Sequence, residues 1–202
     1  MDIHDYENVY HNTNEYYWGV SPSEMCLEII KLMPPDRHVK VIDIGCGEGK
    51  DAVFLARLGY DVSAFDLSGS GIEKVKRLAA KSNVSVNAFK ADILEYKLDR
   101  HYDILYSSGA LHYIKPELRD EIIENYKAHT NENGLNIFNV FIEKPFIPPA
   151  PEKEEAYLWY SGQLLAYYRD WLIEDFSEIV FECNSSGIAH RHAMNVIYAR
   201  RK

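Results

Sequence analysis

Short apolar runs alternate with stretches of helical period along the middle of the chain, from Val39 to Val140. Such alternation is typical of a parallel sheet that has helices on both faces. Residues 39–44 are apolar on both faces, as in a central parallel strand. We therefore predict an α/β fold whose first five strands are 39–44, 61–65, 84–89, 102–106 and 135–142.

Helices are predicted between these strands. The first covers residues 50–58 and ends at Gly59, because glycine suits the left-handed conformation that closes many helices. In the second helix, Ser70 and Glu73 have the spacing of a capping box. Four apolar residues share one face of this helix: Ile72, Val75, Leu78 and Ala79. Pro116 opens a further helix at a position where proline is tolerated.

The chain is predicted to form a single domain, since 202 residues suffice for one sizeable core. It divides into four segments: an N-terminal cap (1–38), a cofactor-binding core (39–142), a proline-rich loop (143–161) and a last part (162–202). The loop contains prolines that cannot lie in a central strand or helix: Pro145, Pro148, Pro149 and Pro151. Its Tyr157, Trp159 and Tyr160 indicate that part of it packs. The last part is predicted to form a helix at 163–171 and strands at 177–183 and 192–199.

Composition and charge narrow the class of protein. The net charge of −9 would repel a phosphate backbone, so nucleic acid is not an expected partner. Cys26, Cys46 and Cys183 lie far apart, without the paired spacing of a zinc site or a disulfide framework. The acidic start of the chain has no apolar leader region, and no apolar run approaches the ~20 residues that span a bilayer. We expect a cytoplasmic protein with no metal, as a monomer or a homodimer.

Three glycines lie between the first predicted strand and the first helix. Gly45, Gly47 and Gly49 read G-x-G-x-G, and glycine there lets a ligand approach the backbone. Dinucleotide-binding loops read G-x-G-x-x-G instead, and Lys50 occupies the position of their last glycine. The phosphate-binding G-x-x-x-x-G-K pattern fails as well. The loop therefore indicates a cofactor without a pyrophosphate group.

Two acidic residues follow the next strands. Asp66 ends the second strand, 17 residues after Gly49, where a carboxylate can accept hydrogen bonds from both hydroxyls of a ribose. Asp92 follows the third strand, where it could accept from an adenine amino group. Each has a simpler reading: Asp66 could initiate a turn, and Asp92 could cap a short helix.

These segments together resemble the class I S-adenosylmethionine-dependent methyltransferases: residues 41–49, Asp66, Asp92 and residues 102–114. The resemblance implies a Rossmann-like, mostly parallel sheet of seven strands, the last one antiparallel. It implies that Asp43 and the glycine backbone hold the methionine end of S-adenosylmethionine. Residues after the third and fourth strands would flank the adenine and the sulfonium. The cofactor-binding residues predicted in this way are Trp18, Asp43, Gly45, Cys46, Gly47, Asp66, Leu67, Ala91, Asp92, Ile93 and Ser107.

Three shorter motifs are similar to the tellurite-resistance methyltransferase family: Tyr16-Tyr17-Trp18-Gly19, residues 164–171, and His190-Arg191-His192. The resemblance implies methylation of a tellurium or selenium oxyanion, or of another small acceptor. The proline-rich loop departs from the family pattern, so it leaves the acceptor open. Trp18 is predicted to close over the cofactor as an aromatic lid, the alternative being a segment buried on the sheet.

Basic residues are the candidates for binding the acceptor in an acidic chain. His190 and His192 would share one face of a strand, with Arg191 on the other, and Arg169 could join them. Arginine offers a bidentate fork to an oxyanion, and histidine titrates near neutral pH. The alternative is a solvated basic edge near the basic end of the chain. His112, after the fourth strand, could contact cofactor or acceptor, or simply pack.

Rival functions are weighed on the same residues. A methyltransferase for nucleic-acid bases would carry an Asn/Asp-Pro-Pro-aromatic motif where this chain has residues 107–110, Ser-Ser-Gly-Ala. A non-catalytic S-adenosylmethionine sensor has the same cofactor motifs, so the sequence leaves it open. A nicotinamide dehydrogenase would need the dinucleotide spacing. We expect methyl transfer to a small-molecule acceptor.

Overall fold

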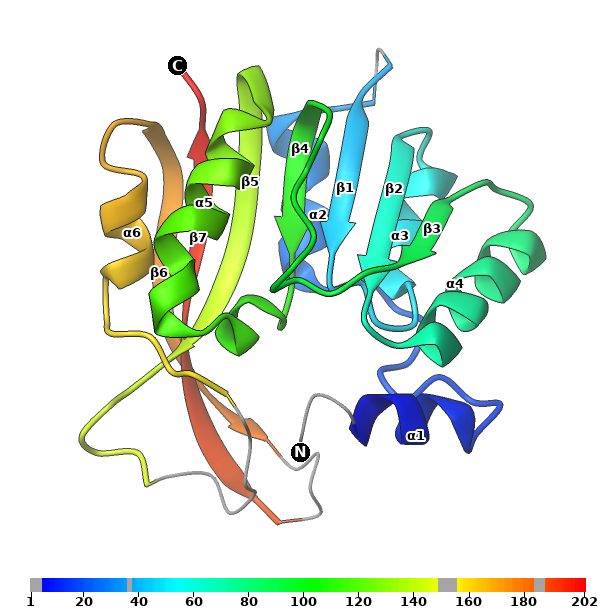
Figure 1. Ribbon diagram of the computed structural model, residues 1–202, viewed down its shortest axis with the longest axis horizontal. Coiled ribbons are helices and arrows are strands. Elements are labelled where there is room, and N and C mark those ends of the chain that lie inside the picture. Colours follow the sequence, from blue (N-terminus) through cyan, green and yellow to red (C-terminus); the bar gives the residue numbers. More distant parts are fainter. Residues whose placement is uncertain (1–4, 36–37, 149–155, 184–187) are drawn as a thin grey trace.

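The computed structural model describes residues 5–35, 38–148, 156–183 and 188–202. Its centre is one seven-stranded sheet in the order β3-β2-β1-β4-β5-β7-β6 (Figure 1). The strands are β1 Lys40–Ile44, β2 Asp61–Asp66, β3 Asn87–Lys90, β4 Tyr102–Ser107, β5 Thr130–Ile142, β6 Leu172–Cys183 and β7 His190–Arg200. Strands β1 to β5 pair in parallel, and β7 runs antiparallel to both β5 and β6. The predicted Rossmann-like class I sheet with an antiparallel last strand is confirmed.

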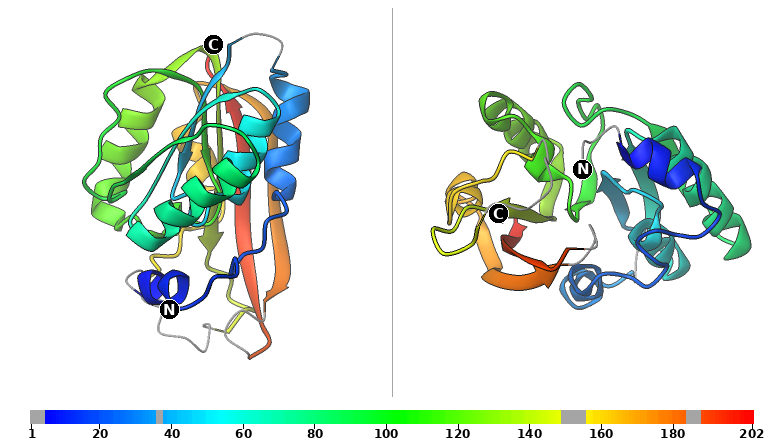
Figure 2. Two further views of the ribbon diagram at one scale, coloured as in Figure 1. Left: turned by 90° about the vertical axis from the view of Figure 1, so that its right-hand side faces the viewer. Right: turned by 90° about the horizontal axis from the view of Figure 1, so that it is seen from below.

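Helices cover both faces of this sheet, as the alternating pattern predicted. They are α1 Asp5–His11, α2 Glu24–Leu32, α3 Lys50–Arg57, α4 Gly69–Lys81, α5 Arg119–Ala128 and α6 Gln163–Tyr167. Short 3₁₀ turns occupy Leu111–Tyr113 and Pro116–Leu118. In the view from below in Figure 2, α5 lies on one side of the sheet and α2 and α3 lie on the other.

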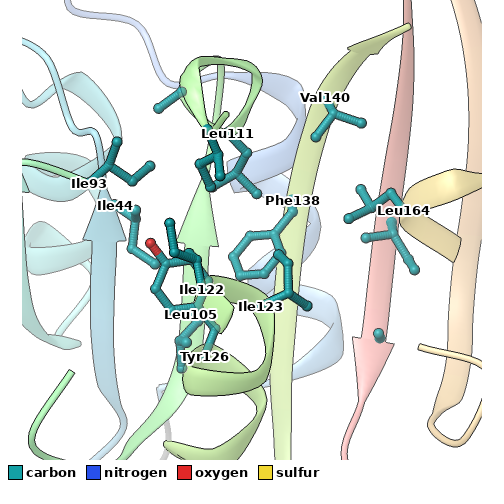
Figure 3. Packing of buried hydrophobic residues seen from close by; sticks show 14 of the residues in the cluster. Ile44, Ile93, Leu105, Leu111, Ile122, Ile123, Tyr126, Phe138, Val140 and Leu164 are labelled. Carbon is teal, nitrogen blue, oxygen red and sulfur yellow. The ribbon is translucent and has the colours of Figure 1, made fainter. Parts of the chain in front are cut away.

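The core has two layers because neighbouring strand residues point to opposite faces. On β1, Val41 packs with α2 and α3, whereas Ile42 and Ile44 pack with α5. Figure 3 shows the second layer, with these labelled side chains meeting between strands and α5: Ile44, Leu105, Phe138, Ile122, Ile123 and Tyr126. Both faces of β1 are thus fully buried, and its end is held in place for the loop that follows.

Several predicted boundaries are wrong, and each has a local cause. The N-cap of α4 is Ser68, whose hydroxyl accepts from the Gly71 N–H at 2.9 Å. Ser70 does not form the predicted capping box, because its hydroxyl donates to Glu7 of α1. The predicted helix at 163–171 stops at Tyr167, and β6 begins at Leu172 instead of residue 177, since it pairs with β7 along its whole length.

The proline-rich loop contains no long helix or strand in its described residues, as predicted, while 149–155 lie outside them. Trp159 is fully buried and forms a parallel bridge with Ile142. The guanidinium of Arg119 lies 4.2 Å from the centre of its ring. Tyr157 and Tyr160 remain exposed. One aromatic side chain therefore anchors the return of this loop to the sheet.

The first described part of the N-terminal cap, from α1 to Trp18, lies at the edge where the parallel strands end. Figures 1 and 2 show α1 below this edge, next to α4. The carboxylate of Glu7 accepts hydrogen bonds from the hydroxyls of Ser68 and Ser70, which lowers its pKa to about 2. Within the described ranges, no helix combines the length and apolarity needed to cross a membrane.

Candidate active site

A cavity of about 360 Å³ opens at the carboxyl ends of the parallel strands. In open α/β sheets this edge, beside the point where the strand order reverses, is where ligands bind. The walls come from the loops after β1, β2, β3 and β4, from the N-terminal cap, and from β5, β6 and β7. The residues predicted from sequence that line it are Trp18, Asp43, Gly45, Cys46, Gly47, Asp66, Leu67, Ala91, Ile93, His112 and His192.

The glycine loop forms the floor of the cavity. Gly45 has a φ of +69°, and a Cβ added there would lie 2.3 Å from the Cβ of Ala110. Gly49, with a φ of +85°, ends the loop as the N-cap of α3, and a Cβ there would overlap Val75. Any larger residue would force the backbone away from the loop after β4 or from α4. The glycines therefore keep the loop close to its neighbours while its backbone faces the cavity.

Asp66 braces this loop from the end of β2. One carboxylate oxygen accepts the Gly47 N–H at 2.8 Å, and the other accepts the Ser68 N–H at 2.9 Å. Burial raises the pKa of Asp66 despite these hydrogen bonds. The carboxylate lies at the cavity wall, where the prediction placed a ribose contact.

Carboxylates dominate the charge at this end of the cavity. Asp43 is almost completely buried, and burial together with nearby Asp51 and Asp66 raises its pKa well above the ordinary value. Asp51 also lines the cavity and accepts hydrogen bonds from Ser23 and Tyr106. A cationic ligand would stabilise these charged carboxylates, whereas a pyrophosphate would be repelled. These carboxylates therefore fit S-adenosylmethionine, which carries an ammonium and a sulfonium.

Two predicted cofactor contacts are placed differently. The Ser107 hydroxyl is fully buried and donates to the Ile44 carbonyl at 2.8 Å, because its position on β4 turns it toward β1. Its neighbour Ser108 lines the cavity instead. The Asp92 carboxylate accepts from the Leu94 N–H at 2.8 Å, so it caps the turn after β3. Asp92 is not among the described residues that line the cavity.

Aromatic side chains of the N-terminal cap close the cavity from outside. Trp18 is 44% exposed, and its indole N–H donates to the hydroxyl of Tyr10 at 2.9 Å. Tyr6 meets Tyr113 edge to face at 6.5 Å, which joins α1 to the loop after β4. All four rings line the cavity. Trp18 thus lies where the predicted lid would be, although Tyr6 and Tyr10 were missed because their position depends on how α1 docks.

A buried ion pair links the glycine loop to the cap. The Lys74 ammonium lies 2.6 Å from the Glu48 carboxylate, and their side chains are only 4% and 1% exposed. Lys74 also donates to the Glu15 carbonyl, and Glu48 accepts the Trp18 N–H. Sequence reasoning missed this pair, since the partners are 26 positions apart and only the packing of α4 brings them together.

The opposite end of the cavity is a stack of rings. His112 lies 4.4 Å from Phe141 between ring centres, and Phe141 lies 4.8 Å from His192, nearly parallel. Burial, with a contribution from the charge of His192, lowers the pKa of His112 to about 3, so its ring is neutral at physiological pH. No hydrogen-bond partner for the His112 Nδ1 exists among the residues that the structure describes. The His112 ring lines the cavity, although this nitrogen itself is shielded from solvent.

The predicted basic cluster is only partly assembled. The Nε2 atoms of His190 and His192 lie 2.8 Å apart, as expected for residues on one face of β7. Arg191 is exposed on the other face, and among described residues it does not line the cavity. Arg169 is also exposed and precedes β6, whereas Cys183 and His190 pair at the far end of that strand. The expectation that Arg169 joins the cluster is wrong.

Comparison with known proteins finds a matching family and similar methyltransferases. The family described as "Tellurite resistance protein TehB" matches residues 4–191. A "Probable S-adenosyl-L-methionine-dependent methyltransferase TehB" of Haemophilus influenzae is 27% identical over 90% of this chain and 60% of that protein. The chain therefore spans about three fifths of this curated relative. A ubiquinone biosynthesis O-methyltransferase of Rickettsia typhi is 31% identical over 57% of this chain and 47% of its own length.

Solved structures agree on the fold. The crystal structure of TehB from Haemophilus influenzae superposes with a TM-score of 0.80 at 25% identity, over 99% of this chain and 67% of that one. The magnesium protoporphyrin IX methyltransferase of Synechocystis, solved with bound S-adenosylhomocysteine (SAH), has a TM-score of 0.70 at 14% identity, over 99% of this chain and 87% of that one. At such low identity the second likeness concerns the fold alone.

Proposed function

The chain belongs to the tellurite resistance protein TehB family, and on this premise we propose that it transfers a methyl group from S-adenosylmethionine to a small-molecule acceptor. The observation that carries the proposal is the two-ended cavity. Its acidic end holds the glycine loop, Asp43 and Asp66, and its other end holds the stacked His112, Phe141 and His192. The cofactor would bind at the first end and the acceptor at the second.

S-adenosylmethionine supplies an electrophilic methyl group on a positively charged sulfur. The acceptor lone pair forms the new bond to the methyl carbon as the carbon–sulfur bond breaks, and the electron pair stays on sulfur in SAH. Positive charge on sulfur is quenched in this step, so alignment and exclusion of water matter more than proton transfer.

Each end of the cavity has a task in this reaction. Asp43, almost fully buried, is placed to pair with the ammonium of the cofactor, and Asp66 with the ribose hydroxyls. Tyr10 and Trp18, which line the cavity and are hydrogen-bonded to each other, would exclude water from the reacting atoms. The neutral ring of His112 lines the acceptor end without adding charge to it. His192, stacked on Phe141, lines the same end and is held by His190 behind it.

For the acceptor we propose an oxyanion of tellurium or selenium. The family description and the hydrogen-bonding rings at the second end of the cavity support this choice. Other small acceptors are the competing class, because one relative is named a ubiquinone biosynthesis O-methyltransferase. Incubation with S-adenosylmethionine and a panel of tellurite, selenite, thiols and phenols, with SAH as the readout, separates them. SAH formation with tellurite or selenite, together with a methylated oxyanion, is the expected result.

Variants locate the acceptor end. His192→Ala is expected to raise the KM for the acceptor at least about tenfold, because a hydrogen-bonding ring at the reacting centre is lost, while the Kd for S-adenosylmethionine changes little. The exposed His38, which pairs with Asp61 at the other edge of the sheet, gives the matched control His38→Ala. Equal loss of acceptor and cofactor binding in His192→Ala would contradict the assignment. If no acceptor in the panel leads to SAH formation, the result would favour a non-catalytic sensor over an enzyme.

A further inference from the structure

Three side chains of the kind that bind transition metals meet beside the cavity, where β6 ends and β7 begins. Cys183, the last residue of β6, pairs across the sheet with His190, the first residue of β7. His192 follows on the same face of β7. The Cys183 sulfur and one nitrogen of each ring lie within 4.8 Å of one another. We propose that these residues bind a divalent transition-metal ion, with Zn²⁺ as the best fit.

The hydrogen bonds of His190 orient its ring for this role. Its Nδ1 lies 2.7 Å from the Ile188 carbonyl oxygen, which can only accept, so Nδ1 carries the proton. In the neutral ring the lone pair is then on Nε2, the atom that points toward His192. Histidines that bind metals commonly donate their other ring N–H to a carbonyl in this way. The backbone beside β7 therefore fixes both the tautomer and the direction of the donor atom.

Stacking fixes the second ring. His192 lies nearly parallel to Phe141, with an interplanar angle of 9°, and Phe181 of β6 flanks it at 5.7 Å. These two rings hold the imidazole in place beside donor atoms that are themselves only partly buried. The ligands on both strands are thus held largely in place before an ion binds.

The donor set and its spacing select the metal. One thiolate and two imidazoles suit Zn²⁺ or Co²⁺, whereas Mg²⁺ and Ca²⁺ prefer oxygen ligands. Zinc bonds of about 2.0–2.3 Å in a tetrahedron place ligand atoms about 3.3–3.8 Å apart. To reach this spacing the two Nε2 atoms, now 2.8 Å apart, must separate, and His192 must give up the Nε2 proton that it donates to His190.

Three protein ligands leave the fourth position of a tetrahedral ion open. Cys183 and His192 both line the cavity, so the open position faces its interior, at the end with His112 and Phe141. The site could hold a water molecule or an oxygen or sulfur atom of a small ligand there. This inference goes beyond the proposed methyl transfer and does not rest on it.

The test is a titration of the reduced, chelator-treated full chain with Co²⁺, without S-adenosylmethionine. The expected result is one ion per chain with a thiolate-to-cobalt charge-transfer absorption, which Zn²⁺ then displaces. Cys183→Ser should abolish this absorption, and His190→Ala should weaken binding at least about tenfold. Cys46→Ser removes another thiol at the same cavity and should leave the absorption unchanged, as should His38→Ala, which removes an exposed histidine.

The outcomes separate clearly. No charge-transfer absorption in the unaltered protein would mean that His190 and His192 only bond to each other, and it would overturn the proposal. Absorption that survives Cys183→Ser would place the ion elsewhere and overturn it as well. Calorimetry with S-adenosylmethionine on the same variants shows whether they are folded. It also separates a failure of the metal site from a failure of cofactor binding, since the residues proposed to hold the cofactor, Asp43 and Asp66, are not ligands of the ion.

Discussion

Removing Lys74 tests how the glycine loop is held to the N-terminal cap. In Lys74→Met the ammonium is lost, but the Glu48 carboxylate stays buried, with the Trp18 N–H as its remaining hydrogen-bond donor among the described residues. Breaking a buried ion pair on one side costs about 3–5 kcal/mol, because an uncompensated charge remains in the interior. For a domain of this length each kcal/mol lowers Tm by about 2–4 °C, so we expect a loss of about 6–20 °C.

The assay is urea unfolding of four proteins: the unaltered chain, Lys74→Met, Glu48→Gln and the double variant. Removing both charges leaves no buried ion, so the double variant should be about 2 kcal/mol more stable than Lys74→Met. Lys76→Met is the matched control on the same helix. Its partner Glu73 is 72% exposed and Lys76 itself 52%, so that loss should cost under about 1 kcal/mol.

Two results would refute this reasoning. Equal free energies of unfolding for Lys74→Met and Lys76→Met would mean that the pair of Lys74 with Glu48 is solvated, and would contradict a buried pair. A double variant as unstable as the sum of the single ones would show that Glu48 and Lys74 do not interact.

Two further predictions concern the cavity. Gly45→Ala should weaken S-adenosylmethionine binding at least about tenfold by calorimetry, because its Cβ would overlap Ala110, while Gly59→Ala, with open space around it, should bind normally. Burial lowers the folded-state pKa of His112 from 6.5 to about 3, so the folded protein binds fewer protons than the unfolded chain in that window. The stability present above pH 6.5 is therefore lost as the pH is lowered, and the free energy of unfolding drops by about 2 kcal/mol between pH 7 and pH 5. In His112→Gln, the free energy of unfolding measured with urea should lack this part of its dependence on pH. Equal pH dependence in His112→Gln and the unaltered chain would contradict the lowered pKa of His112.

The sequence predicted the parts of the fold that depend on local pattern. β1 and the glycine loop were clear because the strand is apolar on both faces and the loop needs glycines. The start of β6 was missed because an edge strand with mostly exposed residues has no clear alternation. Ser68 was missed as the N-cap of α4 because two serines lie close together, and only the contact of Ser70 with Glu7 separates their roles.

The acidic end of the cavity was predictable for the same reason, since Asp66 ends β2 and Asp43 is the last residue but one of β1. The rest depends on tertiary contacts. Glu48 meets Lys74 only through the packing of α4, and Tyr10 reaches the cavity only because α1 docks there. Cys183 and His190 lack the short spacing of zinc motifs. The pairing of β6 with β7 brings them together, so the sequence alone did not indicate the cluster.

The central claim is that the cavity binds S-adenosylmethionine, and isothermal titration calorimetry tests it most directly. We predict one molecule bound per chain, no heat with NADH, and affinity at least about tenfold weaker in Asp66→Asn, which keeps the shape but loses the charge at the end of β2. An unaltered chain that binds NADH, or that fails to bind S-adenosylmethionine, would contradict the claim.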